Sequence, residues 1–237
     1  YFAGTLSEFV DLGHENINNL KFISSWLLSL CFTFQFYFDF SGYVDMATGS
    51  ALMFNIVLPQ NFNSPFKATS IIDFWQRWHI TLSNFLTNYI YFPLLRSLKN
   101  INFFNSMIIT FVVFLIAGFW HGPSWLYVIF GVLHGIGLIL NHIYKKLFDY
   151  KFNKYFACFL TFNYVNLTFI FFRSDNLDIS LTIIKSMLGL NGFENFNYFE
   201  DKLYIILILI IAMAIAFIFK NTSYLIDKFD QEIKKEN

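Results

Sequence analysis

Long apolar stretches recur along this chain of 237 residues. A helix that crosses a membrane needs about 20 mostly apolar residues. Five stretches come close to that length: Phe22–Phe38, Phe104–Trp120, Trp125–Leu140, Phe156–Phe172 and Leu203–Phe219. The pattern predicts an all-α fold, a polytopic membrane helix bundle that forms one integral domain over residues 1–237.

The region between the first two apolar stretches, residues 39–95, has a different pattern. It is apolar and aromatic, but acidic, glycine and proline residues interrupt it: Asp39, Gly42, Asp45, Pro59, Pro65 and Pro93. Irregular backbone at membrane depth persists only where protein or a water-filled cavity covers it. We therefore expect short, partly re-entrant helices around a tunnel in this region.

Composition supports a membrane protein. Hydrophobic residues make up 56% of the chain and charged residues 14%, whereas a soluble domain typically has about 25% charged residues. The formal net charge is zero, so nothing indicates a nucleic-acid partner. The chain starts at Tyr1 rather than Met and carries no signal-peptide pattern. We expect it to be an N-terminally truncated part of a longer protein.

The basic residues suggest an orientation. The loop after Trp125–Leu140 contains Lys145, Lys146, Lys151 and Lys154, and further lysines follow in the C-terminal tail, among them Lys234 and Lys235. Short cytoplasmic loops are enriched in Lys and Arg. We therefore predict a multi-pass protein of the cytoplasmic (inner) membrane, with this loop and the C-terminus in the cytoplasm.

Two histidines stand out in apolar surroundings. His121 lies in the segment FWHGPSW, directly after a long apolar run. A histidine in such surroundings loses hydration, so it needs either a partner or a chemical role. His79 lies in IIDFWQRWHITLSNFL, which predicts an amphipathic helix capped by Ser70 or Asp73, with Trp75 and Trp78 on the face of His79. From these segments alone, a packed core histidine at 121 and an interfacial histidine at 79 are the simpler interpretations.

Other polar groups also need partners. On a continuous helix Asp39 and Asp45 would lie about 240° apart, and we expect Ser41-Gly42 to break the helix between them. Arg77 or a backbone N–H group could pair with these carboxylates, either as a structural ion pair or beside a catalytic histidine or polar tunnel. His134, between two glycines, predicts close helix packing and an interhelical hydrogen bond.

Motifs for metals and nucleotides are missing. The sequence has no HExxH motif, no Cys/His cluster, no phosphate-binding glycine loop and no GxSxG motif. We predict no metal site and no tightly bound cofactor.

Four segments together resemble one protein family: DFSGYVDMATG, FWQRWHITLSNFLTNYIYFPL, GFWHGPSW and FGVLHGIGL, in this order. They are similar to the membrane-bound O-acyltransferases, in the branch of bacterial alginate and peptidoglycan O-acetyltransferases and D-alanyl transfer proteins. The resemblance covers roughly residues 30–175. One departure lies at YIYFPLLRSLKN, where relatives often continue YIYIPLGG with a glycine-rich turn, so the resemblance does not extend to the shape of this loop.

The resemblance implies an enzyme that moves an acyl group, acetyl by preference, from acetyl-CoA or another acyl thioester to a hydroxyl group. His121 matches the histidine of the WHG motif, and we expect it to act as the general base. His79 matches the second conserved histidine and would hold the donor, polarise its carbonyl or orient His121. Supporting or tunnel-lining roles are expected for Asp39, Asp45, Trp75, Trp78, Trp120 and Arg77.

The same resemblance implies a peptidoglycan or exported polysaccharide acceptor, and a periplasmic or secreted acetyltransferase as partner. Three alternatives remain open at this stage. One is a D-alanyl transfer protein. Another, from a different class, is a proton-coupled transporter or channel that uses His79, His121, Asp39 and Asp45. The third is an inactive fragment.

Overall fold

The computed structural model describes residues 1–148, 152–194, 203–226 and 228. Over these residues all regular structure is helical, which confirms the predicted all-α class. The α-helices are α1 (Phe2–Glu15), α2 (Phe22–Met53), α3 (Ile71–Trp75), α4 (Ile80–Leu86), α5 (Phe92–Arg96), α6 (Phe103–Trp120), α7 (Trp125–Leu147), α8 (Lys154–Arg173), α9 (Leu177–Met187) and α10 (Leu203–Phe217). Short turns η1 (Ile17–Asn19) and η2 (Pro65–Lys67) and a π-helical turn η3 (Thr87–Tyr91) complete them.

Three of these helices, α6, α7 and α8, are long and apolar enough to cross a membrane. The five predicted spans all form helices, but two of them differ from the expectation. α10 is apolar but only 15 residues long in the described part of the chain. α2 runs far beyond Phe38 and becomes exposed towards Met53. The lysines at positions 151, 234 and 235, and the C-terminus itself, lie outside the described residues.

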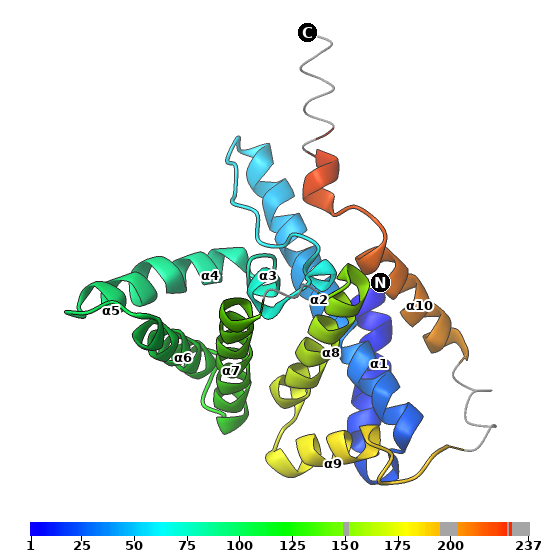
Figure 1. Cartoon of the computed structure of the whole chain (residues 1–237). Helices are drawn as coiled ribbons and strands as arrows, with labels where there is room; N and C mark the ends of the chain where they lie inside the picture. Colours follow the sequence, from blue (N-terminus) through cyan, green and yellow to red (C-terminus); the bar gives the residue numbers. More distant parts are fainter. Residues whose placement is uncertain (149–151, 195–202, 227, 229–237) are drawn as a thin grey trace.

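The helices form two groups that meet at the segment around α3 (Figure 1). One group contains α1, α2, α8, α9 and α10, and the other contains α4 to α7. α6 and α7 pack as an antiparallel pair, and α7 also contacts α3 and α8, which joins the two groups.

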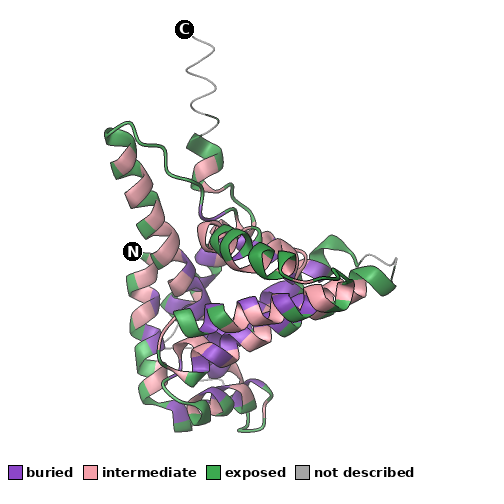
Figure 2. Ribbon diagram, turned by 90° about the vertical axis from the view of Figure 1, so that its left-hand side faces the viewer, coloured by how far each residue is buried: buried purple, intermediate pink, exposed green. Residues whose placement is uncertain are grey.

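Aromatic side chains fill the core where α2, α8 and η2 cross. Phe34 of α2 is fully buried and packs against Phe66 and Phe162 at ring distances of 5.4 and 5.8 Å. Figure 2 shows the buried positions where helices meet, and exposed or half-buried positions along α4, α5 and the far end of α2. The centre of the molecule is therefore largely aromatic and built from segments distant in sequence.

Two local predictions are wrong. α2 is continuous from Phe22 to Met53, so Ser41-Gly42 does not break it, and residues 39–53 belong to a long helix rather than to re-entrant pieces. The predicted helix over residues 74–86 is interrupted instead, because α3 ends at Trp75 and α4 begins at Ile80. Ser70 does cap α3: its hydroxyl accepts from the Asp73 N–H at 3.1 Å.

Candidate active site

His79 occupies a strained turn at the start of α4. Its backbone is left-handed, with φ 45° and ψ 53°, a conformation that costs a residue with a Cβ about 1 kcal/mol or more. The buried Asn61 holds this turn: its backbone carbonyl accepts from the Ile80 N–H at 3.0 Å, and its side-chain oxygen accepts from the Thr81 N–H at 3.1 Å. Strain kept in place by neighbours is typical of functional positions.

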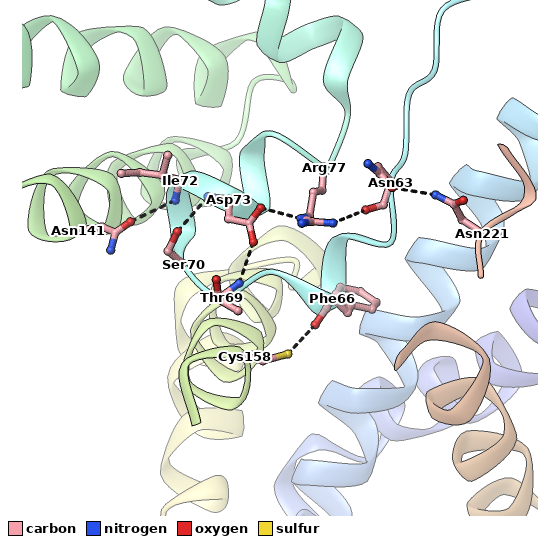
Figure 3. Close-up of polar contacts among 10 residues, drawn as sticks. All are labelled: Asn63, Phe66, Thr69, Ser70, Ile72, Asp73, Arg77, Asn141, Cys158 and Asn221. Atoms are coloured by element: carbon pink, nitrogen blue, oxygen red, sulfur yellow. Dashed lines mark hydrogen bonds and ion pairs between the residues drawn. The ribbon is translucent and has the colours of Figure 1, made fainter. Parts of the chain in front are cut away.

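The segment that carries His79 is tied to three other parts of the molecule (Figure 3). Its Ile72 N–H donates to Asn141 of α7 at 3.4 Å, and the Phe66 carbonyl accepts from the Cys158 thiol of α8 at 3.1 Å. Asn221, after α10, donates to Asn63 at 3.0 Å. These ties fix the chain around His79 relative to α7, α8 and α10.

His121 lies at the turn between α6 and α7. α6 ends at Trp120, His121 follows as its C-cap, and Gly122 has φ +144°, a value that favours glycine. Ser124 then caps α7 by accepting from the Leu126 N–H at 3.2 Å. The helix is interrupted at Gly122-Pro123, and this turn leaves His121 half-buried at a defined corner.

Three phenylalanines connect the two histidines. The His121 ring packs edge-on against Phe172 of α8 at 5.1 Å, and Phe172 packs against Phe36 of α2 at 5.1 Å. Phe36 lies one helical turn from Phe40, and the Phe40 ring meets the His79 ring edge-on at 4.9 Å. The structure thus brings His79 and His121, 42 positions apart in the sequence, to one aromatic region.

Burial keeps both rings neutral. Burial first, and second the repulsion from His121 when that ring is protonated, together lower the pKa of His79 to about 4. Burial also lowers the pKa of His121. Neither residue lies within the three candidate spans. Both imidazoles are therefore uncharged at neutral pH and can accept a proton.

The predicted tryptophans have different surroundings. Trp78 is buried against Phe36 at 5.5 Å, so it packs on one of the three phenylalanines that lie between the two histidines. Trp75 is also buried, and its indole N–H donates to His134 at 3.1 Å. Trp120 contacts His121 at 5.0 Å but is 63% exposed.

The predicted charged residues do not pair with each other. Arg77 forms an ion pair with Asp73 at 2.6 Å instead of with Asp39 or Asp45. Asp73 is only four positions before Arg77 in the sequence, which brings their side chains together. Asp39 is exposed, and Asp45 accepts from Thr222 at 2.8 Å. Asp45 also lines a cavity of about 190 Å³ with Tyr37 of α2 and Lys220. Neither histidine of the candidate site lines this cavity.

His134 has a structural role. Because the Trp75 indole can only donate, His134 Nδ1 accepts and Nε2 carries the proton, which goes to the Thr168 hydroxyl at 2.9 Å. That hydroxyl in turn donates to the Val165 carbonyl at 2.7 Å. The predicted interhelical hydrogen bond is confirmed, and the chain of bonds joins α3, α7 and α8 around a fully buried ring.

Comparison with known proteins matches the sequence to one family. Residues 4–177, which include all of the motifs that carry the two histidines, match the model of the membrane-bound O-acyltransferase family. The chain belongs to this family. It is an integral membrane protein, as the family and the apolar helices α6 to α8 indicate.

Several relatives are acetyltransferases by name. A peptidoglycan O-acetyltransferase of Helicobacter pylori is 48% identical over 80% of this chain and 36% of its own length. The probable alginate O-acetylase AlgI of Pseudomonas putida is 36% identical over 72% of the chain and 35% of its own length. A teichoic acid D-alanyltransferase of Streptococcus thermophilus is 31% identical over 63% of the chain and 41% of its own length. The chain thus spans about a third of the length of the first two relatives.

Sequence reasoning missed Asn61 and the phenylalanine bridge. Asn61 lies in an irregular loop where no periodicity marks it, 18 positions before His79. A signal for the bridge was present, since Phe32, Phe36 and Phe40 recur every four residues and thus share one face of a helix. In the described ranges 1–148, 152–194, 203–226 and 228, no group of three or more His, Cys, Asp or Glu could hold a metal ion.

Proposed function

We propose that this chain carries the catalytic histidines of a membrane-bound O-acyltransferase that moves an acetyl group from a thioester to a hydroxyl of the cell wall. One observation supports the proposal above all: His79 and His121, the two histidines in the family's motifs, pack against the two ends of one row of aromatic rings, formed by Phe172, Phe36 and Phe40. Two neutral imidazoles in an aromatic, partly buried region suit acyl transfer, because a thioester must be kept from water.

In the proposed reaction His121 is the general base. Its neutral ring takes the proton of the acceptor hydroxyl, the oxygen forms a bond to the thioester carbonyl carbon, and the C–S bond then breaks. The proton on His121 passes to the departing sulfur, so the products are an ester and a free thiol. General base catalysis of this kind contributes about 10²–10⁴-fold to the rate.

We propose peptidoglycan as the acceptor. The basis is similarity: the chain is 48% identical to the peptidoglycan O-acetyltransferase, against 36% and 31% for the alginate and D-alanyl relatives. The test below also distinguishes two alternatives. One is an exported polysaccharide as the acceptor, and the other is D-alanine in place of acetyl as the transferred group. The donor is acetyl-CoA or another acyl thioester. A secreted acetyltransferase would carry the group to acceptors beyond the membrane surface.

We place the protein in the cytoplasmic membrane with the Lys145–Lys146 end of α7 in the cytoplasm. These two lysines end α7, and Lys154 begins α8, so three basic residues gather on one side of the candidate spans. The positive-inside rule assigns such a side to the cytoplasm.

The proposal is tested with membranes that contain the protein, labelled acetyl-CoA and peptidoglycan fragments. Release of free thiol and transfer of label to the fragments are measured. We expect His121→Ala to reduce transfer by at least about 10²-fold and His79→Ala to reduce it strongly. Wild-type rates in the His121→Ala protein would contradict the assignment of the base.

His142→Ala is the matched control. His142 is a half-buried histidine near the end of α7 and lies outside the site, so its loss should leave transfer unchanged. If the label is found on an alginate-type polysaccharide instead, the proposed acceptor is wrong. If the protein is active only with a D-alanyl thioester, the proposed donor is wrong. Substrate movement across the membrane without thiol release would favour a transporter instead.

A further inference from the structure

The contacts around Asn61 fix more than the backbone of the His79 turn. The Asn61 side-chain oxygen lies 3.1 Å from the Thr81 N–H nitrogen, 2.8 Å from the Thr81 hydroxyl and 3.2 Å from Nδ1 of His79. A backbone N–H can only donate. The Asn61 atom that faces it must therefore be the side-chain oxygen and not the amide nitrogen.

This assignment determines the proton on His79. Because the Asn61 oxygen can only accept, Nδ1 of His79 must be the donor in the contact between them. The Thr81 hydroxyl lies 3.5 Å from the same nitrogen and gives its own proton to Asn61, so it too presents a lone pair to Nδ1. A neutral histidine with a proton on Nδ1 has a lone pair on Nε2.

We propose that Asn61 is a positioning residue for acyl transfer: it holds His79 as the tautomer with the proton on Nδ1 and leaves Nε2 as a proton acceptor. No residue in the described part of the chain donates a hydrogen bond to Nε2, so this atom is free for substrate or for a neighbouring N–H group. Neutral His79 then cannot polarise the thioester carbonyl, because it has no N–H to offer there.

The geometry around Asn61 is rigid enough for this role. Asn61 is 8% exposed, its backbone carbonyl binds the Ile80 N–H, and the Ile80 and Thr81 amides start α4. The groups that pack against His79 from other elements are neutral, Phe40 of α2 and Asn61 itself. His121 is the titratable group whose charge acts on His79. The proposal rests on the proposed function for its role in catalysis, but the tautomer is a property of the resting protein.

The first test measures the tautomer directly. The protein is labelled with ¹⁵N-histidine, and the His79 signal is assigned by its loss in His79→Gln. Couplings between ring protons and ring nitrogens show which nitrogen carries the proton. We expect Nδ1–H in the wild type and a mixture of both tautomers in Asn61→Ala. A wild-type proton on Nε2, or an unchanged spectrum in Asn61→Ala, would overturn the proposal whether or not the protein transfers acyl groups.

The second test separates positioning from mere structure. Asn61→Asp keeps an acceptor for Thr81 and for His79 Nδ1 but adds a negative charge, which favours the charged imidazole. We expect the pKa of His79, followed by NMR as a pH profile of its ring signals, to move up by about 1 pH unit or more in this variant. Asn61→Ala should lose about 10- to 100-fold in kcat through misplacement of the ring. An unmoved profile in Asn61→Asp would contradict a role through His79.

Asn63→Ala is the matched control. Asn63 is an exposed asparagine two positions along the same loop, and its side chain binds Asn221 rather than either histidine. It should keep the wild-type tautomer and pH profile. If the Asn61→Ala protein fails to fold, the wild-type spectrum and the Asn61→Asp profile still decide. If wild-type protein transfers no acyl group, the proposed function is wrong. The NMR spectra still test whether Asn61 sets the tautomer of His79.

Discussion

At the scale of the residue, the buried His134 and the half-buried His79 and His121 differ in what their ring nitrogens contact. His134 has both nitrogens satisfied, by Trp75 and Thr168, and so has no free position for chemistry. His79 has one nitrogen held by Asn61. His121 meets only the rings of Trp120, Tyr127, Phe130 and Phe172 in the contacts described. The polar partners, rather than burial alone, distinguish a structural histidine from a candidate catalytic one.

The lowered pKa values predict the pH dependence of transfer. A general base works in its neutral form, and a pKa below the usual 6.5 keeps that form present at lower pH. Burial lowers the pKa of both His79 and His121. We therefore expect kcat/KM to fall with decreasing pH only below 6.5, the ordinary pKa of histidine, as the pH approaches the lowered pKa. The measurement is a pH–rate profile with saturating acceptor. A half-maximal rate at pH 7 or above would contradict it.

At the scale of the element, the corner that carries His121 depends on the close packing of α6 and α7. A Cβ on Gly118 of α6 would lie 2.5 Å from the Tyr127 carbonyl oxygen, and one on Gly131 of α7 would meet the Phe114 carbonyl oxygen even more closely. Neither backbone oxygen can move aside without separating the helices. We expect Gly131→Val to destabilise the protein by about 1–3 kcal/mol and to lower its melting temperature.

A glycine in open surroundings provides the control for this prediction. A Cβ on Gly49 of α2 would meet no atom within 4 Å, so Gly49→Ala should be neutral or should stabilise the helix by up to about 1 kcal/mol. Both variants are compared by thermal unfolding in the same detergent. Equal melting temperatures for Gly131→Val and the wild type would show that α6 and α7 are not packed as closely as described.

At the scale of the whole molecule, periodic features could be predicted and irregular ones could not. The apolar runs gave α6, α7 and α8 because a membrane helix needs length and hydrophobicity, both visible in sequence. The left-handed turn at His79 was not predictable, since FWQRWHITL fits a helix and only Asn61, far away in the sequence, makes the turn favourable. The two motif histidines were found through resemblance. The aromatic region that the two histidines share depends on Phe36 and Phe172, which look like ordinary membrane residues in the sequence.

The orientation of the molecule supplies the last prediction. α8 runs from Lys154 to Arg173, so the end of α7 at Lys145 and the start of α9 at Asp178 should lie on opposite sides of the membrane. In a chain whose two cysteines, Cys31 and Cys158, are replaced by alanine, we expect Asp178→Cys to react with a membrane-impermeant maleimide on intact spheroplasts. Lys145→Cys should react only after permeabilisation, because basic loops remain in the cytoplasm. Labelling of both on intact cells would contradict a crossing by α8, and the reverse pattern would invert the proposed orientation.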